Sequence, residues 1–378
     1  MTINREVARI ASRTNKIDRN HVYPLIMNGD MRINQRGSTG LSDGQTVTMD
    51  RWSFLVNEGG FSMSQVTDVP SGQGFKHAIK IDCTTADTSL TNDAHIQFFQ
   101  RFEGQDLALL NKGTSSAESL TVIFWAKSTV TGTFVVELKD HDNSRTVSKT
   151  TTISSADTWE KKIVTFPGDT STNDDFTYDN GLSFDVKIWL GAGSDYTSGT
   201  LNTTWADQTN ANRAVGQTIN IASSTDNNFF TTGWQLELGE FTSGNEPEFQ
   251  FVDQATQLKQ CQRYYQTIVN DNDQYMGNGH YHDEDYLFVP AHFKNTMRAA
   301  PTAEVTTGGS YWRAEGGDNS SGDTFDNIDG VAHATNKCAM FYTDGDNVSI
   351  PGNNVRANNT FKLRSNNASA RLALVADL

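Results

Sequence analysis

Two histidines in the last third of the chain lie two positions apart. His280 and His282 stand in the stretch Gly279-His-Tyr-His-Asp-Glu-Asp-Tyr286. On an extended strand, side chains at i and i+2 point to the same side, so both imidazoles face one spot. One chain supplies two nitrogens, whereas three copies around a three-fold axis supply six, and imidazoles suit an octahedral transition-metal ion. The alternative is a solvated loop that binds no metal, which the acidic residues 283–285 favour.

Four aromatic residues stand in polar surroundings where a sugar could stack on a ring. Tyr196 and Trp205 lie in the polar run 193–210, and Tyr311 and Trp312 follow two glycines. An exposed aromatic ring covers the apolar face of a sugar, while nearby Asp and Asn accept its hydroxyls. These four residues are therefore predicted glycan contacts. The alternative is that each ring pins its own loop to the body of the protein.

The remaining motifs predict structure and no catalysis. Trp52, Trp125 and Trp234 lie within apolar strand patterns and are predicted core residues. No nucleophile elbow, zinc-protease motif or phosphate-binding loop is present. Cleavage of a polysaccharide would need two carboxylates held a few ångströms apart, and a sequence does not show such a pairing. We therefore expect a protein that is not an enzyme.

The composition argues against two classes of binding partner. The chain has 378 residues and a formal net charge of -15, which repels nucleic acid and acidic membranes. The three cysteines share no metal-like spacing and are predicted to be small buried residues. The sequence shows no secretory signal and no stretch as long as a membrane span, so assembly in a reducing cytoplasm is expected.

Many short alternating runs predict an all-β protein. In residues 182–190, Phe184, Val186 and Ile188 alternate with Asp185 and Lys187, so apolar and charged side chains take opposite faces. Such runs, separated by turn residues and with no helix between them, predict an antiparallel jelly-roll β-sandwich. The runs are 50–56, 61–66, 75–83, 94–102, 120–126, 134–138, 146–153, 159–166, 182–190, 219–222 and 229–238.

The chain divides into three parts. Residues 25–245 form the predicted jelly roll, and residues 246–378 a smaller C-terminal β domain that opens with a short helix. The strands predicted in this second domain are 264–269, 286–292, 303–306, 337–342, 361–363 and 370–376. Its long loops, 277–285 and 307–330, are of the kind that small β domains present to a partner.

Residues 1–24 form a basic arm before the first strand. Its apolar residues recur at helical spacing and its arginines surround them, which predicts a short amphipathic helix that becomes ordered in an assembly. The alternative is a frayed basic tail. The predicted docking residues are Ile3, Arg5, Val7, Arg9, Ile10 and Arg13.

Six short segments together resemble bacteriophage tail-fibre proteins. Near the start these are Asn28-Gly-Asp-Met31, Gln35-Arg-Gly37 and Asp50-Arg-Trp52. Trp234-Gln-Leu-Glu-Leu-Gly239 and Cys261-Gln-Arg-Tyr-Tyr265 are similar to that family's closing strand and junction. Thr296-Met-Arg-Ala-Ala-Pro301 is similar to a segment of its C-terminal unit.

The resemblance implies a jelly roll like those of carbohydrate-binding modules, followed by a receptor-facing tip. It implies a homotrimer on a virion tail fibre that contacts other tail proteins through its N-terminus and a bacterial surface glycan elsewhere. The family pattern carries no catalytic residues. Two alternatives remain: a purely structural virion component, such as a head or neck fibre or an adaptor, and a polysaccharide depolymerase.

A structural calcium ion is a further expectation from this kind of fold. Asp30 and Glu237 come from the first and last strands of the predicted jelly roll, which can be neighbours. Ca²⁺ is bound there by carboxylates and backbone oxygens. The alternative is that both are ordinary surface carboxylates or are paired with arginine.

Overall fold

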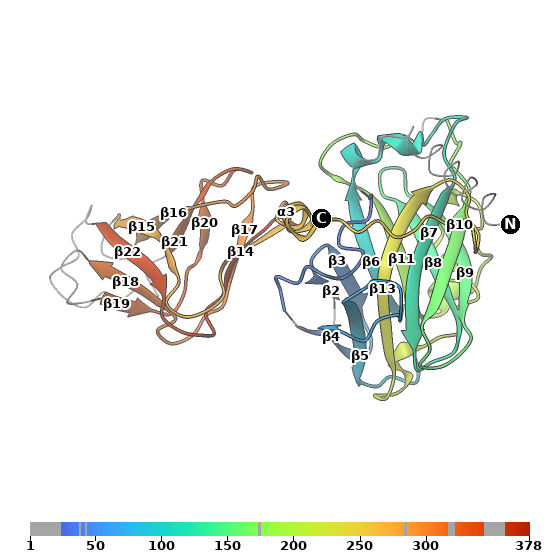
Figure 1. The fold of residues 1–378 in the computed structure, drawn as a ribbon, viewed down its shortest axis with the longest axis horizontal. Helices are drawn as coiled ribbons and strands as arrows, with labels where there is room; N and C mark the ends of the chain where they lie inside the picture. The colour runs from blue at the N-terminus through green and yellow to red at the C-terminus, as the bar shows by residue number, and fades with distance from the viewer. Residues whose placement is uncertain are drawn as a thin grey trace.

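The computed structural model describes residues 24–37, 39–41, 44–172, 175–282, 286–316, 322–343 and 360–378. The predicted docking arm, with Ile3, Arg5, Val7, Arg9, Ile10 and Arg13, lies outside these ranges. Two β-rich bodies make up the described chain, a large sandwich and a smaller second domain (Figure 1). The all-β prediction is confirmed. None of the helices in the described ranges is long and apolar enough to cross a membrane.

The large body is a sandwich of two antiparallel sheets, which we name sheet A and sheet B. Sheet A has the order β1 (Thr39–Leu41), β4 (Gly60–Val66), β5 (Ala78–Thr85), β13 (Asn228–Leu238), β7 (Leu120–Ser128) and β10 (Glu160–Phe166). Sheet B has the order β12 (Ala206–Asp207), β9 (Arg145–Ile153), β8 (Gly132–Asp140), β11 (Leu182–Ala192), β6 (His95–Glu103), β3 (Trp52–Val56) and β2 (Gly44–Met49). The chain crosses between the sheets several times, from β3 to β4, β5 to β6, β6 to β7, β7 to β8, β9 to β10 and β10 to β11.

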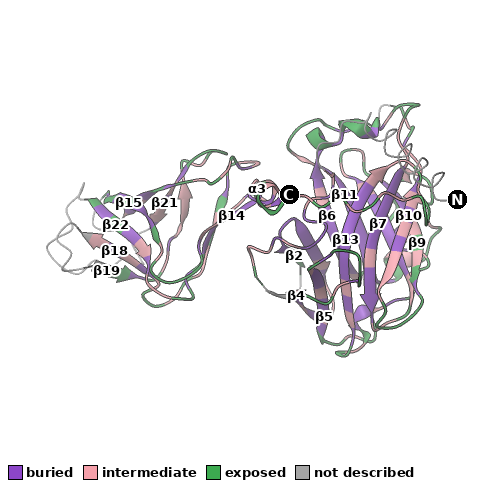
Figure 2. Cartoon of the chain, in the orientation of Figure 1, coloured by how far each residue is buried: buried purple, intermediate pink, exposed green. Residues whose placement is uncertain are grey.

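The core between the sheets is built on stacked aromatic rings. Trp234 of β13 stacks on Phe124 at a centroid distance of 4.1 Å, and Trp52 stacks on Phe98 at 4.8 Å. Trp52 and Trp234 are 0% and 1% exposed, so both are confirmed as core residues. Buried residues run along the strands of both sheets (Figure 2). Trp125 is only half-buried and was wrongly predicted as core, because β7 is apolar on both faces and Trp125 is on the outward one.

Three other details differ from the sequence prediction. Residues 219–222 are not a strand, since η4 (Ile221–Ser223) forms a short 3-10 turn there. The predicted loop at 277–285 begins as strand β15 (Tyr275–Tyr281). The third cysteine, Cys338, is exposed, whereas Cys83 and Cys261 are buried as predicted.

The second domain begins with helix α3 (Gln254–Cys261), which the sequence predicted and which Asp253 caps through the amide of Thr256. A three-stranded sheet follows, with the order β14 (Tyr265–Val269), β23 (Leu372–Val375) and β17 (Thr302–Val305). A seven-stranded sheet has the order β19 (Gly322–Phe325), β18 (Trp312–Gly316), β22 (Thr360–Ser365), β15, β16 (Leu287–Ala291), β21 (Ala339–Thr343) and β20 (Gly330–Ala332). These sheets enclose a hydrophobic core separate from that of the sandwich.

Segments that are distant in the sequence meet where the two domains join, at α3 (Figure 1). The Glu103 carboxylate, at the end of β6, is completely buried. It accepts hydrogen bonds from the Arg263 guanidinium at 2.8 and 2.6 Å and from the Tyr264 hydroxyl. The Arg51 guanidinium in turn lies 3.4 Å over the Tyr264 ring. The segments around Arg51 and Arg263 therefore form one joint.

Residues near position 377 return to the same joint. The Asp377 carboxylate accepts hydrogen bonds from Arg36 at 2.6 and 2.8 Å, and the Arg36 guanidinium lies 3.8 Å over the Tyr265 ring. Arg298 donates to the carbonyl oxygens of Asp377 and of Asn180 in the sandwich. Four of the six segments that carry the family resemblance thus line this joint.

The other two segments pack against each other beside the joint. The Trp234 amide donates to the Gly29 carbonyl at 3.0 Å, and a Cβ at Gly29 would lie 2.2 Å from the Trp234 carbonyl oxygen. Glycine is therefore the residue that fits this approach. Asp30 accepts a hydrogen bond from Gln257 of α3 at 3.1 Å, which connects this corner of the sandwich to the helix.

We predict that Arg263→Met lowers the free energy of unfolding by about 3–5 kcal/mol, because it leaves the buried Glu103 carboxylate without its ionic partner. Urea denaturation of the full chain measures the change. Arg313→Met is the matched control, since Arg313 pairs with Glu315 where both side chains are partly exposed, and should cost less than about 1 kcal/mol. Equal losses in the two variants would contradict the role assigned to the joint.

Candidate functional site

Tyr196 and Trp205, two of the predicted glycan contacts, are half-buried and hold their loop against the sandwich. The Trp205 indole donates to the Pro167 carbonyl at 2.9 Å and packs against the sandwich core. The Tyr196 ring, in α2 (Ser194–Thr197), lies 5.1 Å from the Trp189 ring. These contacts match the structural alternative, in which the loop is pinned by its own aromatics. The exposed part of each ring leaves the prediction of a glycan contact open.

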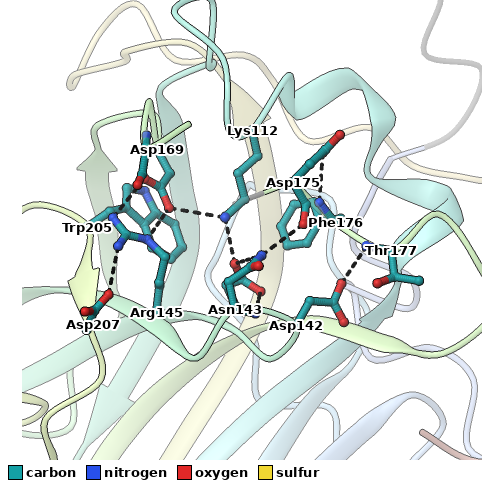
Figure 3. A network of polar contacts seen from close by, with 12 residues as sticks. Lys112, Asp142, Asn143, Arg145, Asp169, Asp175, Phe176, Thr177, Trp205 and Asp207 are labelled. Carbon is teal, nitrogen blue, oxygen red and sulfur yellow. Dashed lines mark hydrogen bonds and ion pairs between the residues drawn. The ribbon is translucent and has the colours of Figure 1, made fainter. Parts of the chain in front are cut away.

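A buried network of charges lies beside Trp205 (Figure 3). The Lys112 ammonium lies between two carboxylates, 2.6 Å from Asp140 and 3.2 Å from Asp169, and all three side chains are at most 4% exposed. Arg145 adds two hydrogen bonds to Asp169. Burial alone would raise the pKa of Asp169, but the bonds from Arg145 and the charge of Lys112 hold it below the usual value. Each buried charge has a partner here, so this network stabilises the loops around Trp205.

Trp312 is a correction to the predicted glycan contacts. Its side chain is 0% exposed and belongs to the core of the second domain. Strand β18 alternates, so Trp312 and Ala314 point inward although the preceding sequence looks like a loop. Tyr311 is half-buried and packs on the same core. Of Tyr311 and Trp312, only Tyr311 therefore keeps exposed surface.

Asp30 and Glu237, the residues of the expected calcium site, both have side-chain partners, and the site itself stays a prediction. The first segment and the last strand of the sandwich are indeed neighbours, through the bond from Trp234 to Gly29. However, the Asp30 carboxylate lies 2.6 Å from the Arg32 guanidinium, and the Gln235 side chain donates to Glu237 at 3.2 Å. In the described ranges, no group of three or more His, Cys, Asp or Glu side chains is arranged to hold a metal. The contact of Asp30 with Arg32 matches the alternative of an arginine-paired carboxylate.

His280 and His282 lie on the same side of their strand. Each ring centroid is 5.8 Å from that of Phe288 on the neighbouring strand β16. His280 and His282 are both exposed. The geometry fits the prediction that the two imidazoles face one spot, and the three-fold metal site itself stays a prediction.

The sequence analysis missed a larger cluster on the outward face of sheet B. The strand register aligns Arg101, Asp185 and Lys139 in one row across β6, β11 and β8. The next row holds Phe99, Lys187, Glu137 and Ser148 in the same way. The alternation along β11 was predicted correctly, since Val186 and Ile188 are in the core. The pairing between strands, which brings these charges together, was not visible in the sequence.

Two buried acids form the centre of this cluster. Asp185 is 1% exposed and lies 2.8 Å from His141 Nε2 and 3.1 Å from the Lys187 ammonium. Glu137 is fully buried, accepts hydrogen bonds from Arg213 and accepts another from the Trp189 indole at 3.0 Å. Arg213 comes from the loop that carries Tyr196, so this loop covers one edge of the cluster.

The cluster lowers the pKa values of an acid and of two bases, for different reasons. Burial alone would raise the pKa of Asp185, but the charges of Lys187 and His141 hold it well below the usual value. Burial and the nearby Lys187 ammonium lower the pKa of Lys139. Burial also lowers the pKa of Arg101. The cations on this face are therefore less well solvated than ordinary surface cations, and additional acceptor groups would stabilise them.

Three buried polar atoms on the face have no hydrogen-bond partner among the described residues. They are Asp185 Oδ1, Ser148 Oγ and Arg101 Nε, from three different strands of sheet B. The side chains of Lys139, His141 and Arg101 are partly exposed. Unsatisfied buried polar atoms are few in folded proteins, and three of those in the described residues lie on this one face.

The fold defines this chain as an antiparallel β-sandwich protein with a second β domain. No protein-family model matches the sequence, and no curated protein matches it. Solved structures do align with it. One is the enzymatically active domain of tailspike protein 4 from bacteriophage CBA120, with 13% identity, 57% of this chain and 21% of that chain covered, and a TM-score of 0.29. The match thus spans about a fifth of the tailspike chain.

Carbohydrate-binding modules align at a similar level. A family 11 module from Clostridium thermocellum, in complex with a β-1,3-1,4-mixed-linked tetrasaccharide, shares 13% identity over 54% of this chain and 95% of its own, with a TM-score of 0.25. A tandem pair of family 22 modules from Paenibacillus barcinonensis shares 8% identity over 94% of this chain and 98% of its own, with a TM-score of 0.28.

We predict that Asp185→Asn lowers the free energy of unfolding at neutral pH by about 3–5 kcal/mol, because it leaves Lys187 buried with a weakened partner. The folded-state pKa of Asp185 is depressed, so its contribution is present above the unfolded pKa of about 4 and is lost as the pH falls further. The decline in stability between about pH 5 and pH 2 should be shallower in the variant. Urea denaturation across this pH range measures both effects. Asp226→Asn, at an exposed acid, is the control. A variant whose pH dependence equals that of the wild type would rule out this role for Asp185.

Proposed function

We propose that this protein is a non-catalytic component of a bacteriophage tail fibre whose sandwich domain binds a bacterial surface glycan through the outward face of sheet B. The observation that carries the proposal is the cluster of Arg101, Lys139, His141, Asp185 and Lys187 on that face. It combines partly exposed donors with buried atoms whose hydrogen bonds are incomplete. The placement of the protein on a virion rests on the family resemblance of its six segments.

A glycan fits this face better than the other common ligand classes. Sugars present many hydroxyls, each both a donor and an acceptor, and these match a surface of mixed charge. Nucleic acid would be repelled by a chain with a net charge of -15. Phe99 and Trp189 lie on the face but are buried. We therefore expect recognition by hydrogen bonds to charged side chains, with Tyr196 at the edge as the stacking ring.

We predict that the full chain binds polysaccharide extracted from its host and that Lys139→Ala weakens this binding at least tenfold, or about 1.4 kcal/mol. The reason is the loss of a partly exposed donor beside Asp185 on this face. Biolayer interferometry on immobilised polysaccharide measures the affinity. Lys80→Ala is the control, because Lys80 lies on sheet A and pairs with Asp82. No binding by the wild type to any host polysaccharide would overturn glycan recognition, and released reducing sugars would overturn the proposal of a non-catalytic protein.

A purely structural virion component is the second candidate, and the joint favours it. The bonds of Glu103, Asp377 and Asn180 fix the second domain to the sandwich at several separate points. A connector or neck fibre needs such rigidity whether or not it binds a receptor. Binding of the purified chain to host cells separates the two functions, since a connector leaves the cells unlabelled.

We predict that the full chain is a homotrimer, as the family resemblance implies, because fibres are built from symmetric contacts. Light scattering should give about three times the chain mass of 41.7 kDa. A monomer at micromolar concentration would contradict the fibre proposal. Docking to other tail proteins through the arm at residues 1–24 belongs to the same proposal.

A further inference from the structure

A cleft lies where α3 meets the loops of the second domain. It has a volume of about 660 Å³, within the range of small-molecule sites. One wall comes from α3 and the turn after it, with Lys259 and Arg263. The other wall comes from residues 293–296 and from Lys337. This cleft lies outside sheet B, and the function proposed above does not use it.

Four cations and no acid line the cleft, in a chain whose net charge is -15. Arg263 is occupied by Glu103, so its charge is balanced. Lys259, Lys294 and Lys337 are exposed. The Lys294 ammonium donates to the Thr267 carbonyl at 2.6 Å, which fixes its position and leaves two of its protons for a ligand. The cleft therefore concentrates positive charge that its own walls do not neutralise.

The wall that carries Lys294 is held in place by a buried side chain. Gln266 is 0% exposed, accepts a hydrogen bond from the Lys294 amide at 2.7 Å and donates to the Asn295 carbonyl at 2.6 Å. The Met297 amide donates to the Asn336 carbonyl at 2.8 Å, which ties the loop of Lys337 to the same wall. Lys294 is held by both its amide and its ammonium, so it loses less entropy on binding than a free surface lysine does.

The rest of the lining suits a sugar ring. Phe293 is half-buried and presents apolar surface beside the lysines. Thr256, Gln260 and Asn295 add hydroxyl and amide groups that can donate to or accept from sugar hydroxyls. A ligand that complements this cleft has an anionic group, several hydroxyls and one apolar ring face.

We infer that this cleft binds an acidic saccharide unit, one that carries a carboxylate or a phosphate group. The inference rests on the proposed function in one respect, since the saccharide would belong to the polysaccharide that the fibre contacts. Lysine serves as a point charge for either anion, so the cleft selects negative charge and a sugar ring together. The second domain would then recognise the charge of a surface polysaccharide, while sheet B recognises its hydroxyls.

Calorimetry with the full chain tests the inference. The probes are a short oligosaccharide of glucuronic acid, the same oligosaccharide with its carboxyl groups reduced, and inorganic phosphate. The wild type should bind the acidic oligosaccharide at least tenfold more tightly than the reduced form. The triple variant Lys259→Gln, Lys294→Gln and Lys337→Gln should lose this preference. All three lysines are exposed, so the variant is expected to fold, and its thermal unfolding checks this.

The control variant has the same net charge but an intact cleft. Lys76→Gln, Lys80→Gln and Lys362→Gln remove three positive charges elsewhere on the surface. If this control loses as much binding as the cleft variant does, the loss comes from the lower overall charge of the chain, and the inference of a specific site is wrong. If phosphate binds as tightly as the oligosaccharide, the cleft binds anions without recognising a sugar ring, and the inference of a saccharide site is wrong. If the acidic oligosaccharide does not bind while host polysaccharide binds through Lys139, this inference fails alone. If no polysaccharide binds, the proposed function fails as well.

Discussion

The pairing of Arg263 with Glu103 is the interaction on which the arrangement of the two domains depends. A carboxylate with no exposed surface is costly unless it is neutralised, and the partner that neutralises Glu103 comes from the other domain. The sandwich therefore supplies the buried carboxylate, and the second domain supplies the cation that neutralises it. Two cation–aromatic contacts add to this pair. The Arg51 guanidinium lies over the Tyr264 ring, and the Arg36 guanidinium lies over the Tyr265 ring.

This arrangement shows where the six segments that resemble tail-fibre proteins lie in the structure. The residues that resemble tail-fibre proteins, such as Arg36, Arg51, Arg263 and Arg298, make the joint and its hydrogen bonds. They do not gather on the outward face of sheet B. The segments that carry the resemblance therefore lie at and beside the joint between the sandwich and the second domain. The residues of the proposed glycan site lie between these segments, in strands where the sequence carries no family motif.

The sequence predicted the fold better than the sites, for reasons that particular residues illustrate. Alternation along β11 placed Val186 in the core and Asp185 outside it, because a strand has a period of two. The same rule misplaced Trp125, since β7 is apolar on both faces. Trp312 looked like a loop residue because β18 is short and follows two glycines. The contact of Asp185 with His141 depends on the pairing of β11 with β8, which no local pattern encodes.

The second domain is attached to the sandwich through both ends of its chain. Strand β14 leaves the joint directly after Tyr264, and β23 returns beside it, with the Ala376 amide donating to the Tyr264 carbonyl at 2.8 Å. Strands β18, β19 and β22 lie at the far end of the domain from the sandwich (Figure 1). A pull applied there reaches the sandwich covalently through β14 and α3, and non-covalently through the segment after β23, where Asp377 bonds to Arg36. Tension would shear the β14–β23 pair along its length, and shear breaks several hydrogen bonds at once, where peeling breaks them in turn. The connection between the domains thus resists tension more strongly than a single linker of the same length would.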